Sequence, residues 1–404
     1  FITSGYIAWL AGSHNKHNQQ IAKGVFQELI DKVVKLGGSD GRVDIGKGHG
    51  SRIVFEPEMF KFAAFELLEK EGVRLLLHSF VSDVAVEGNM IKGVAAYNKS
   101  GRQMIQGKIF VDATGDADIA AAGGVPYNKG REKDGWMNAM SLKFRVGGVD
   151  IDKLTKWYEE NRPQDPNTHI PSPLKKEPSI AGAGYFLVIY TFKERRELIV
   201  NAMSIYKDGT DVDELTESEV EARKRVLPLM NFLKREVPGF ENSYVIATAP
   251  QTGARETRRI LGEYILTVDE VKEGKRFKDV IGRGAFPIDI HYPNELSLVE
   301  IESDYDIPYR CLLPKKIENL LVAGRCISVD HQTVGTIRLT VTCMVTGQAA
   351  GTAAALAVKD KLLPKQVDVS KLQKSLVDQG AILYDNQVFE SLNVTQQLPL
   401  AIKV

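Results

Sequence analysis

The stretch Asn319-Leu-Leu-Val-Ala-Gly-Arg325 and the segment behind it decide the fold of this 404-residue chain. Leu320 to Ala323 is a short, unbroken apolar run, which predicts a buried strand. Gly324 and Arg325 interrupt that run, and a polar loop follows them. The sequence then predicts a long helix from Arg338 to Lys359, with small residues at helical spacing at Gly347, Ala350, Gly351, Ala354 and Ala355.

This order of strand, glycine turn and helix has two interpretations. A stripe of small residues lets a helix lie close to a neighbouring backbone or to a flat ligand. The first turn of a helix also presents free backbone N–H groups to an anion. The alternative is an ordinary βα unit whose alanine-rich helix is simply buried. The local sequence leaves both interpretations open.

A second glycine turn lies much earlier in the chain. The segment from Gln106 to Val111 predicts a strand, which ends at Asp112-Ala-Thr-Gly-Asp-Ala-Asp118 before an alanine-rich helix start. Upstream, the sequence predicts a helix over 57–70, a strand over 73–77 and a β-meander over 80–97. This order is typical of an α/β nucleotide-binding domain that carries a β-meander.

The predicted elements between residues 127 and 310 do not alternate regularly, which indicates an inserted α+β substrate or cap domain. We therefore predict a discontinuous domain over 1–126 and 311–363, the inserted domain over 127–310, and a C-terminal tail over 364–404 with a short helix. The glycine-rich loop over 40–50 is a weak candidate for a phosphate cradle, because no apolar strand leads into it.

Composition excludes several classes of protein. Lys plus Arg and Asp plus Glu both total 52, and this balance argues against a partner that is nucleic acid or an anionic membrane. The three cysteines lack CxxC spacing, which argues against a metal site and predicts reduced thiols in a cytoplasmic protein. No apolar run is evident at membrane-spanning length. The oligomeric state stays open, with a homo-oligomer among the alternatives.

The two glycine turns, together with Arg255-Glu-Thr-Arg-Arg-Ile260 and Phe286-Pro-Ile-Asp-Ile-His291, resemble motifs of the FAD-dependent oxidoreductase family. The resemblance covers residues 20 to 380 approximately. It implies a glutathione-reductase-type α/β fold: a Rossmann-like FAD-binding domain with a β-meander, incomplete at its N-terminus, plus the inserted α+β domain. It also implies FAD as cofactor and a set of residues that contact it: Val81, Ala113, Thr114, Gly115, Gly324, Arg325, Gly335, Thr336 and Ile337.

One departure from the family pattern concerns the start of the chain. Family members open with a βαβ unit that carries GxGxxG, whose helix N-terminus binds the FAD pyrophosphate. The sequence has no such motif, and it begins at Phe1 without an initiator Met. We expect either that the sequence is a fragment or that this polypeptide binds FAD weakly or not at all.

Four residues are candidates for catalysis. Arg255 and Arg258 are suited to binding a substrate carboxylate, while His291 and His331 can transfer protons near neutral pH. The alternative is that the arginines form ion pairs on a solvated face. The leading hypothesis is an oxidoreductase that moves hydride between FAD and a small-molecule substrate. The second is a flavoprotein-like scaffold without catalytic activity. A hydrolase is disfavoured, because the sequence contains no HExxH motif.

Overall fold

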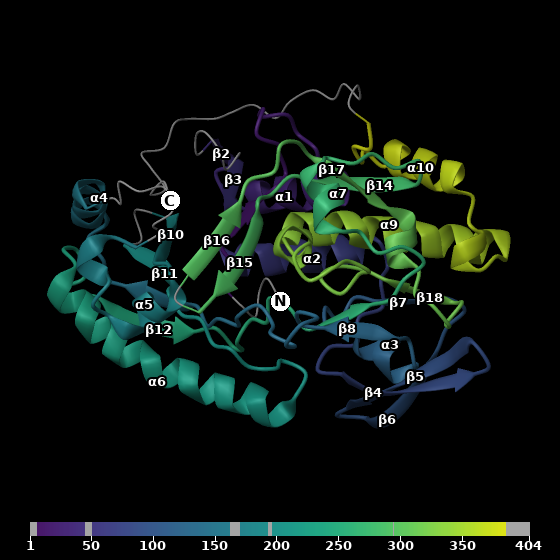
Figure 1. The fold of residues 1–404 in the computed structure, drawn as a ribbon, viewed down its shortest axis with the longest axis horizontal. Helices are drawn as coiled ribbons and strands as arrows, with labels where there is room; N and C mark the ends of the chain where they lie inside the picture. Colours follow the sequence, from purple (N-terminus) through teal and green to yellow (C-terminus); the bar gives the residue numbers. More distant parts are fainter. Residues whose placement is uncertain (1–5, 45–50, 162–169, 193–195, 294, 385–404) are drawn as a thin grey trace.

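The computed structural model describes residues 6–44, 51–161, 170–192, 196–293 and 295–384, and Figure 1 shows its mixed α/β architecture. The two strands predicted to precede the glycine turns lie side by side. Strand β7 (Phe110–Asp112) pairs in parallel with β18 (Leu320–Val322), with Asp112 opposite Val322. This pair connects the first third of the chain with its C-terminal part.

Helix α9 (Thr340–Asp360) runs through the middle of the molecule and contacts this pair of strands (Figure 1). Its fully buried small residues are Ala349, Ala350, Ala353 and Ala357. The stripe predicted at Gly347, Ala350, Gly351, Ala354 and Ala355 is therefore correct only at Ala350, since Gly351 and Ala355 are exposed. By length and composition α9 could also cross a membrane, contrary to the expectation from the sequence. Its contacts with β14 and α1 instead make it the core helix of this fold.

The β-meander is confirmed, and it has one strand more than predicted. Strands β4 (Phe80–Glu87), β5 (Met90–Asn98) and β6 (Gly101–Gln106) form an antiparallel sheet. The strand predicted over Gln106–Val111 is present only as the shorter β7, because Gln106 ends β6. The chain bends between β6 and β7, because the first must pair with β5 and the second with β18, which lies in another sheet.

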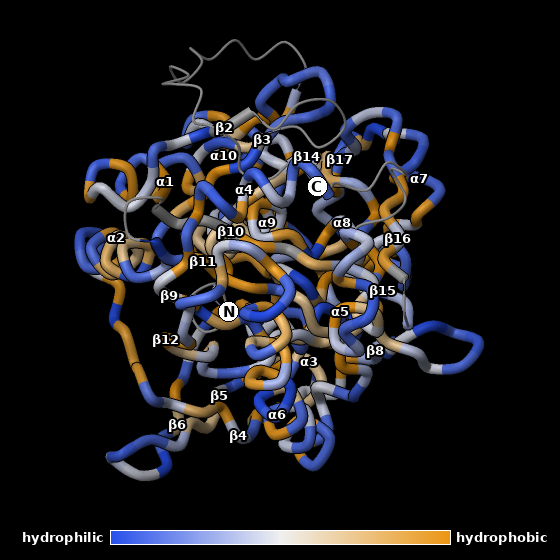
Figure 2. The backbone as a smooth tube through the Cα atoms, turned by 90° about the vertical axis from the view of Figure 1, so that its left-hand side faces the viewer, coloured by the Kyte–Doolittle hydropathy of each residue, from blue (hydrophilic) through white to orange (hydrophobic). Residues whose placement is uncertain are grey.

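The predicted strand over 73–77 is wrong. Val73, Leu75, Leu76, Leu77 and the nearby Phe80 are exposed, with exposed fractions between 39% and 76%. In the part of the chain that the structure describes, no neighbouring strand supplies the hydrogen bonds that a strand here would need. Figure 2 shows this connection between α2 and the meander as a hydrophobic stretch.

The N-terminal elements follow the sequence closely. Helix α2 (Pro57–Lys70) has the predicted bounds, because Glu56 caps it and Pro57 fits its first turn. Helix α1 (Val25–Lys35) begins directly after Gly24, which has a positive φ. Strands β1 (Trp9–Ala11), β2 (Arg42–Asp44) and β3 (Ser51–Val54) form a small sheet beside these helices. Residues 45–50 of the glycine-rich loop predicted over 40–50 lie outside the described residues.

A second layer contains the sheet β10-β11-β9-β12, with α6 along one side (Figure 1). Its members are β9 (Phe144–Gly147), β10 (Leu187–Phe192), β11 (Glu197–Asn201), β12 (Tyr244–Thr248), α4 (Ile151–Glu160), α5 (Pro178–Ala183) and α6 (Val212–Glu236). Its buried residues form a hydrophobic cluster of their own, from Met140 to Ala249. The domain boundaries drawn from the sequence stay a prediction.

Three antiparallel pairs connect the layers: β8 (Tyr127–Lys129) with β13 (Arg258–Ile260), β14 (Val280–Gly284) with β17 (Tyr305–Pro308), and β15 (Ile288–Tyr292) with β16 (Glu295–Val299). The remaining helices are α3 (Asp118–Ala122), α7 (Val268–Lys272), α8 (Val334–Ile337) and α10 (Val369–Asp378).

Asn319 joins the β-meander to the start of β18. Its side chain accepts a hydrogen bond from the Ile91 backbone N–H at 2.8 Å, and it donates to the carbonyl oxygens of Ile91 at 2.8 Å and Lys108 at 3.1 Å. The Asn319 side chain is fully buried, so water cannot take its place as the hydrogen-bond partner of these backbone groups.

We expect Asn319→Ala to lower the free energy of unfolding by about 2–4 kcal/mol, because it leaves buried backbone groups without partners. Urea unfolding followed by circular dichroism would measure the change. The matched control is Asn242→Ala at an exposed position, which should stay within about 0.5 kcal/mol of the unmodified protein. Equal stabilities of the two variants would contradict the role given to Asn319.

Candidate active site

The parallel pairing of β7 and β18 places two glycine turns at one edge of the sheet. Asp112 organises the first turn: its carboxylate accepts hydrogen bonds from the Thr114 N–H at 3.0 Å, the Thr114 hydroxyl at 2.7 Å and the Ala120 N–H at 2.8 Å. In the second turn, Gly324 has φ +85°, a conformation that glycine adopts without strain. Its N–H donates to the Thr346 hydroxyl of α9 at 3.0 Å.

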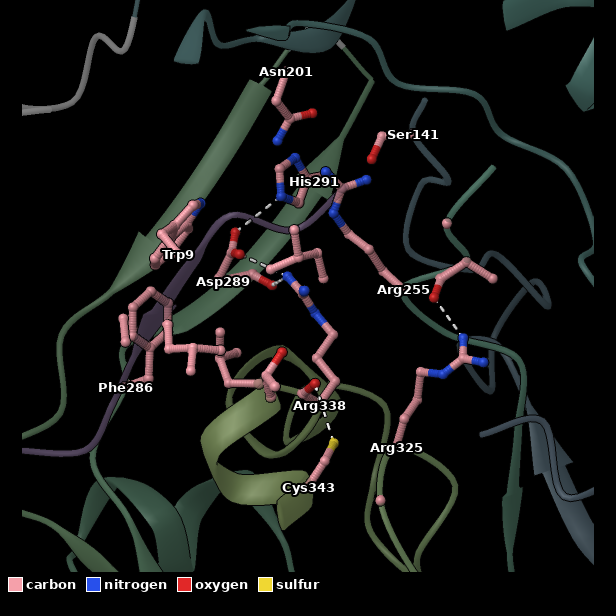
Figure 3. Close-up of a pocket in the computed structure, with 18 of the residues that line it drawn as sticks. Trp9, Ser141, Asn201, Arg255, Phe286, Asp289, His291, Arg325, Arg338 and Cys343 are labelled. Atoms are coloured by element: carbon pink, nitrogen blue, oxygen red, sulfur yellow. Dashed lines mark hydrogen bonds and ion pairs between the residues drawn. The ribbon is translucent and has the colours of Figure 1, made fainter. Parts of the chain in front are cut away.

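Beside these turns lies a cavity of about 430 Å³, between the two layers of the fold. Such a volume is within the usual range of small-molecule sites, about 300–1,000 Å³. One side, which we call the small-residue wall, consists of Ala113, Ala323, Gly324 and Gly347. The other, which we call the charged wall, consists of Lys143, Arg255, Asp289, His291 and Arg338. Figure 3 shows the last four of these residues.

On the charged wall, Asp289 lies between a cation and an imidazole. Its carboxylate oxygen Oδ2 accepts a hydrogen bond from Arg338 Nη2 at 2.6 Å, and Oδ1 lies 3.1 Å from His291 Nε2 (Figure 3). Asp289 and His291 come from the same face of β15, whereas Arg338 follows α8 directly. The Nδ1 atom of His291 is buried and has no hydrogen-bond partner.

Arg255 approaches from the second layer. Its guanidinium donates to the carbonyl oxygen of Ala139 at 2.6 Å and to the Tyr185 hydroxyl at 3.1 Å. The Tyr185 hydroxyl in turn lies 3.0 Å from Asn201 Oδ1, and its ring packs edge-on against His291. These neutral contacts fix the guanidinium beside the cavity without neutralising its charge.

The crowding of cations shifts the pKa values of neighbouring groups. Burial, with the charges of Arg255 and Arg338, lowers the pKa of Lys143 to about 7. Burial and the charge of Arg255 lower the pKa of His291 to about 4, so its imidazole is neutral at pH 7. Burial alone would raise the pKa of Asp289, but His291 and Arg338 outweigh it and hold that carboxyl well below its usual range.

Five of the predicted site residues line the cavity together: Ala113, Gly324, Arg325, Arg255 and His291. Arg325 crosses from the second turn to the first, where it pairs with Asp116 at 2.7 Å and also donates to the Ala254 carbonyl oxygen. Gly115 leaves room for the Arg325 guanidinium, since a Cβ atom at this position would lie 2.8 Å from Arg325 Nη2.

The other predicted residues lie outside the cavity lining: Val81, Thr114, Gly115, Gly335, Thr336, Ile337, Arg258 and His331. Val81 belongs to the meander strand β4. Gly335 packs against the backbone of Asp289, and Thr336 donates to the Phe286 carbonyl oxygen at 2.6 Å. Arg258 pairs with Asp118 at 2.8 Å, while His331 Nδ1 lies 2.8 Å from the buried Glu256 carboxylate.

The sequence analysis missed three members of the charged wall. Asp289 lies two residues before His291, and this spacing places both side chains on one face of a strand. Lys143 lies between the buried residues Leu142 and Phe144, so a lysine within an apolar strand was an available signal. Arg338 had no signal in the sequence, because only the packing of α8 against β15 brings it beside Asp289.

Comparison with solved structures gives only distant matches. A geranylgeranyl bacteriochlorophyll reductase-like protein from Thermoplasma acidophilum is 14% identical, with 84% of this chain and 63% of that chain covered and a TM-score of 0.42. The p-nitrophenol 4-monooxygenase PnpA from Pseudomonas putida is 11% identical, with 92% and 68% covered and a TM-score of 0.39. The chain thus spans less than seven tenths of either protein's length, and likeness at this level carries no argument about chemistry.

No curated protein matches the sequence. The family comparison is more informative, because the family described as "FAD dependent oxidoreductase" matches residues 1–376, which is most of the chain and includes both glycine turns and both walls of the cavity. The chain therefore belongs to the FAD-dependent oxidoreductase family.

Proposed function

We propose that the protein is a flavin-dependent oxidoreductase, with FAD on the small-residue wall and a small-molecule substrate against the charged wall. One observation carries the proposal: the cavity is lined both by a group of alanines and glycines and by a group of titratable side chains. A flat cofactor needs the first, and recognition and proton transfer need the second. Bound FAD would supply the hydride transfer, which no side chain of the protein can perform.

The small-residue wall fits a flat ring system. A Cβ atom on Gly347 would meet no atom within 4 Å, so the space in front of this turn of α9 is open. Gly324 leaves similar room, since its nearest neighbour would be Cys343 at 3.8 Å. The fit concerns the ring alone, because the 404-residue sequence contains no GxGxxG loop for the pyrophosphate.

The charged wall would orient the substrate and exchange its proton. His291 is neutral at pH 7, and its unpartnered Nδ1 can accept a proton, while Asp289 beside Nε2 would stabilise the imidazolium that results. Lys143, with a pKa of about 7, can donate or accept a proton near neutral pH. The ion pair with Arg338 keeps the Asp289 carboxylate ionised at neutral pH.

The second candidate function is a scaffold that does not bind flavin. In this fold the GxGxxG loop supplies N–H groups that bind the pyrophosphate, and the 404-residue sequence contains no such loop. Titration of the purified protein with FAD, followed by the fluorescence of the flavin, separates the two candidates. Saturable binding supports the oxidoreductase, and its absence in the protein extended to its natural start would leave the scaffold.

We expect Gly347→Leu to weaken FAD binding at least about tenfold, or about 1.4 kcal/mol, because the new side chain occupies the space in front of α9. Gly351→Leu, one turn further along α9 at an exposed position, is the matched control and should bind FAD like the unmodified protein. Both substitutions should raise helix stability by about 0.5–1 kcal/mol, which thermal unfolding would verify. Unchanged FAD affinity of Gly347→Leu would show that the ring lies elsewhere.

We expect Lys143→Met to stabilise the fold at pH 6 and to lower substrate turnover. The folded-state pKa of about 7 lies below the ordinary lysine value of 10.5, so the charged lysine destabilises the fold fully below pH 7, and this effect disappears as the pH rises towards 10.5. Each unit of such a shift corresponds to about 1.4 kcal/mol. Urea unfolding at pH 6 and pH 9 should show the larger gain at pH 6, and an equal gain at both would contradict the lowered pKa.

A further inference from the structure

We propose that the charged wall is a carboxylate-binding subsite, formed by Arg255 and Lys143, and that the substrate is therefore a small organic acid. This inference rests on the proposed function, because it assigns the substrate class of the same cavity. It concerns the two cations of the wall that Asp289 does not contact.

Charge is unevenly distributed around the cavity. Its lining contains five cationic side chains and one carboxylate, namely Arg52, Lys143, Arg255, Arg325, Arg338 and Asp289. Two of the cations are neutralised locally, since Arg338 pairs with Asp289 at 2.6 Å and Arg325 pairs with Asp116 at 2.7 Å. Within the described ranges, no carboxylate lies at ion-pair distance from Arg255 or Lys143. The cavity therefore carries an excess of positive charge.

A buried cation without a counter-ion is costly, so its retention points to a ligand. Arg255 is only 9% exposed, and both of its hydrogen-bond acceptors are neutral. Burial, followed by the charges of Arg255 and Arg338, lowers the pKa of Lys143. An anion bound between Arg255 and Lys143 would relieve the repulsion between these two cations and take a charge-assisted hydrogen bond from each.

The surrounding groups favour a carboxylate with an apolar body. Arginine binds a carboxylate through two parallel N–H bonds, and Ala139 and Tyr185 already fix the plane of the Arg255 guanidinium. Asn201 Oδ1 accepts a hydrogen bond from the Tyr185 hydroxyl, so the Asn201 amide nitrogen is left as a hydrogen-bond donor. Apolar side chains line the same cavity at Trp9, Phe286, Leu296 and Leu298, and Figure 3 shows the first two beside Asp289.

Benzoate is a suitable probe, with benzyl alcohol as its neutral analogue and inorganic phosphate as a competing anion. Binding can be followed through the fluorescence of Trp9, which lines the cavity, and by calorimetry, both with and without FAD. We expect benzoate to bind at least tenfold more tightly than benzyl alcohol. Equal binding of the two, or binding of phosphate in place of benzoate, would overturn the proposal.

Variants locate the site. Arg255→Met should weaken benzoate binding at least tenfold and leave FAD binding unchanged, and Arg255→Lys should recover only part of the loss because it lacks the planar fork. Arg235→Met, at an exposed position on α6, removes the same charge far from the cavity and should change neither. Unfolding temperatures confirm that each variant is folded. If Arg255→Met weakens FAD binding and not benzoate binding, the guanidinium serves the cofactor and the proposal is wrong.

The pH dependence gives an independent readout. Benzoate binding should weaken as the pH rises from 6 to 8, because Lys143 loses its proton near pH 7, while Asp289 stays ionised, His291 stays neutral and Arg338 stays charged. Lys143→Met should bind more weakly and without this pH dependence. If FAD fails to bind, only the proposed redox function is wrong. If Arg255→Met and Lys143→Met both bind benzoate as tightly as the unmodified protein, the proposed carboxylate subsite is wrong.

Discussion

The parallel pairing of β7 with β18 is the constraint on which the rest of the structure depends. Its register places Asp112 opposite Val322, so the chain leaves both strands at one edge of the sheet and the two turns meet there. The Asp112 carboxylate fixes one turn, and the Thr346 hydroxyl of α9 fixes the other. Since α9 also contributes Gly347, one register determines the whole small-residue wall.

The charged wall brings like charges together at a cost in stability. Lys143, Arg255 and Arg338 lie around one cavity with Asp289 as the only carboxylate in its described lining. Like charges at close range disfavour the folded state, and natural proteins tolerate such groups mainly where a ligand needs them. The two walls thus follow different principles: one is defined by small residues, and the other by charged groups, of which Arg255 and Lys143 have no carboxylate at ion-pair distance in the described part of the chain.

Local patterns in the sequence were sufficient where an element is stabilised by its own residues. Helix α2 has the predicted bounds because Glu56 and Pro57 define its start, and the meander follows from strand alternation and its turns. Local sequence patterns were insufficient where an element depends on a partner strand elsewhere in the chain. Residues 73–77 have the composition of a buried strand but are exposed, since no described strand lies beside them. Membership of the FAD-dependent oxidoreductase family fits the two glycine turns, whose pairing the structure confirms.

The sequence by itself determined the elements that carry the site: the strand and turn at Asp112, the strand and turn at Gly324, and the helix with its small residues. It also singled out Arg255 and His291, both of which line the cavity. Only the tertiary structure decided that Lys143, Asp289 and Arg338 join them, and that Arg258 and His331 pair with acids elsewhere. The physical reason is that the charge balance of a cavity depends on side chains from distant segments, which no local pattern specifies.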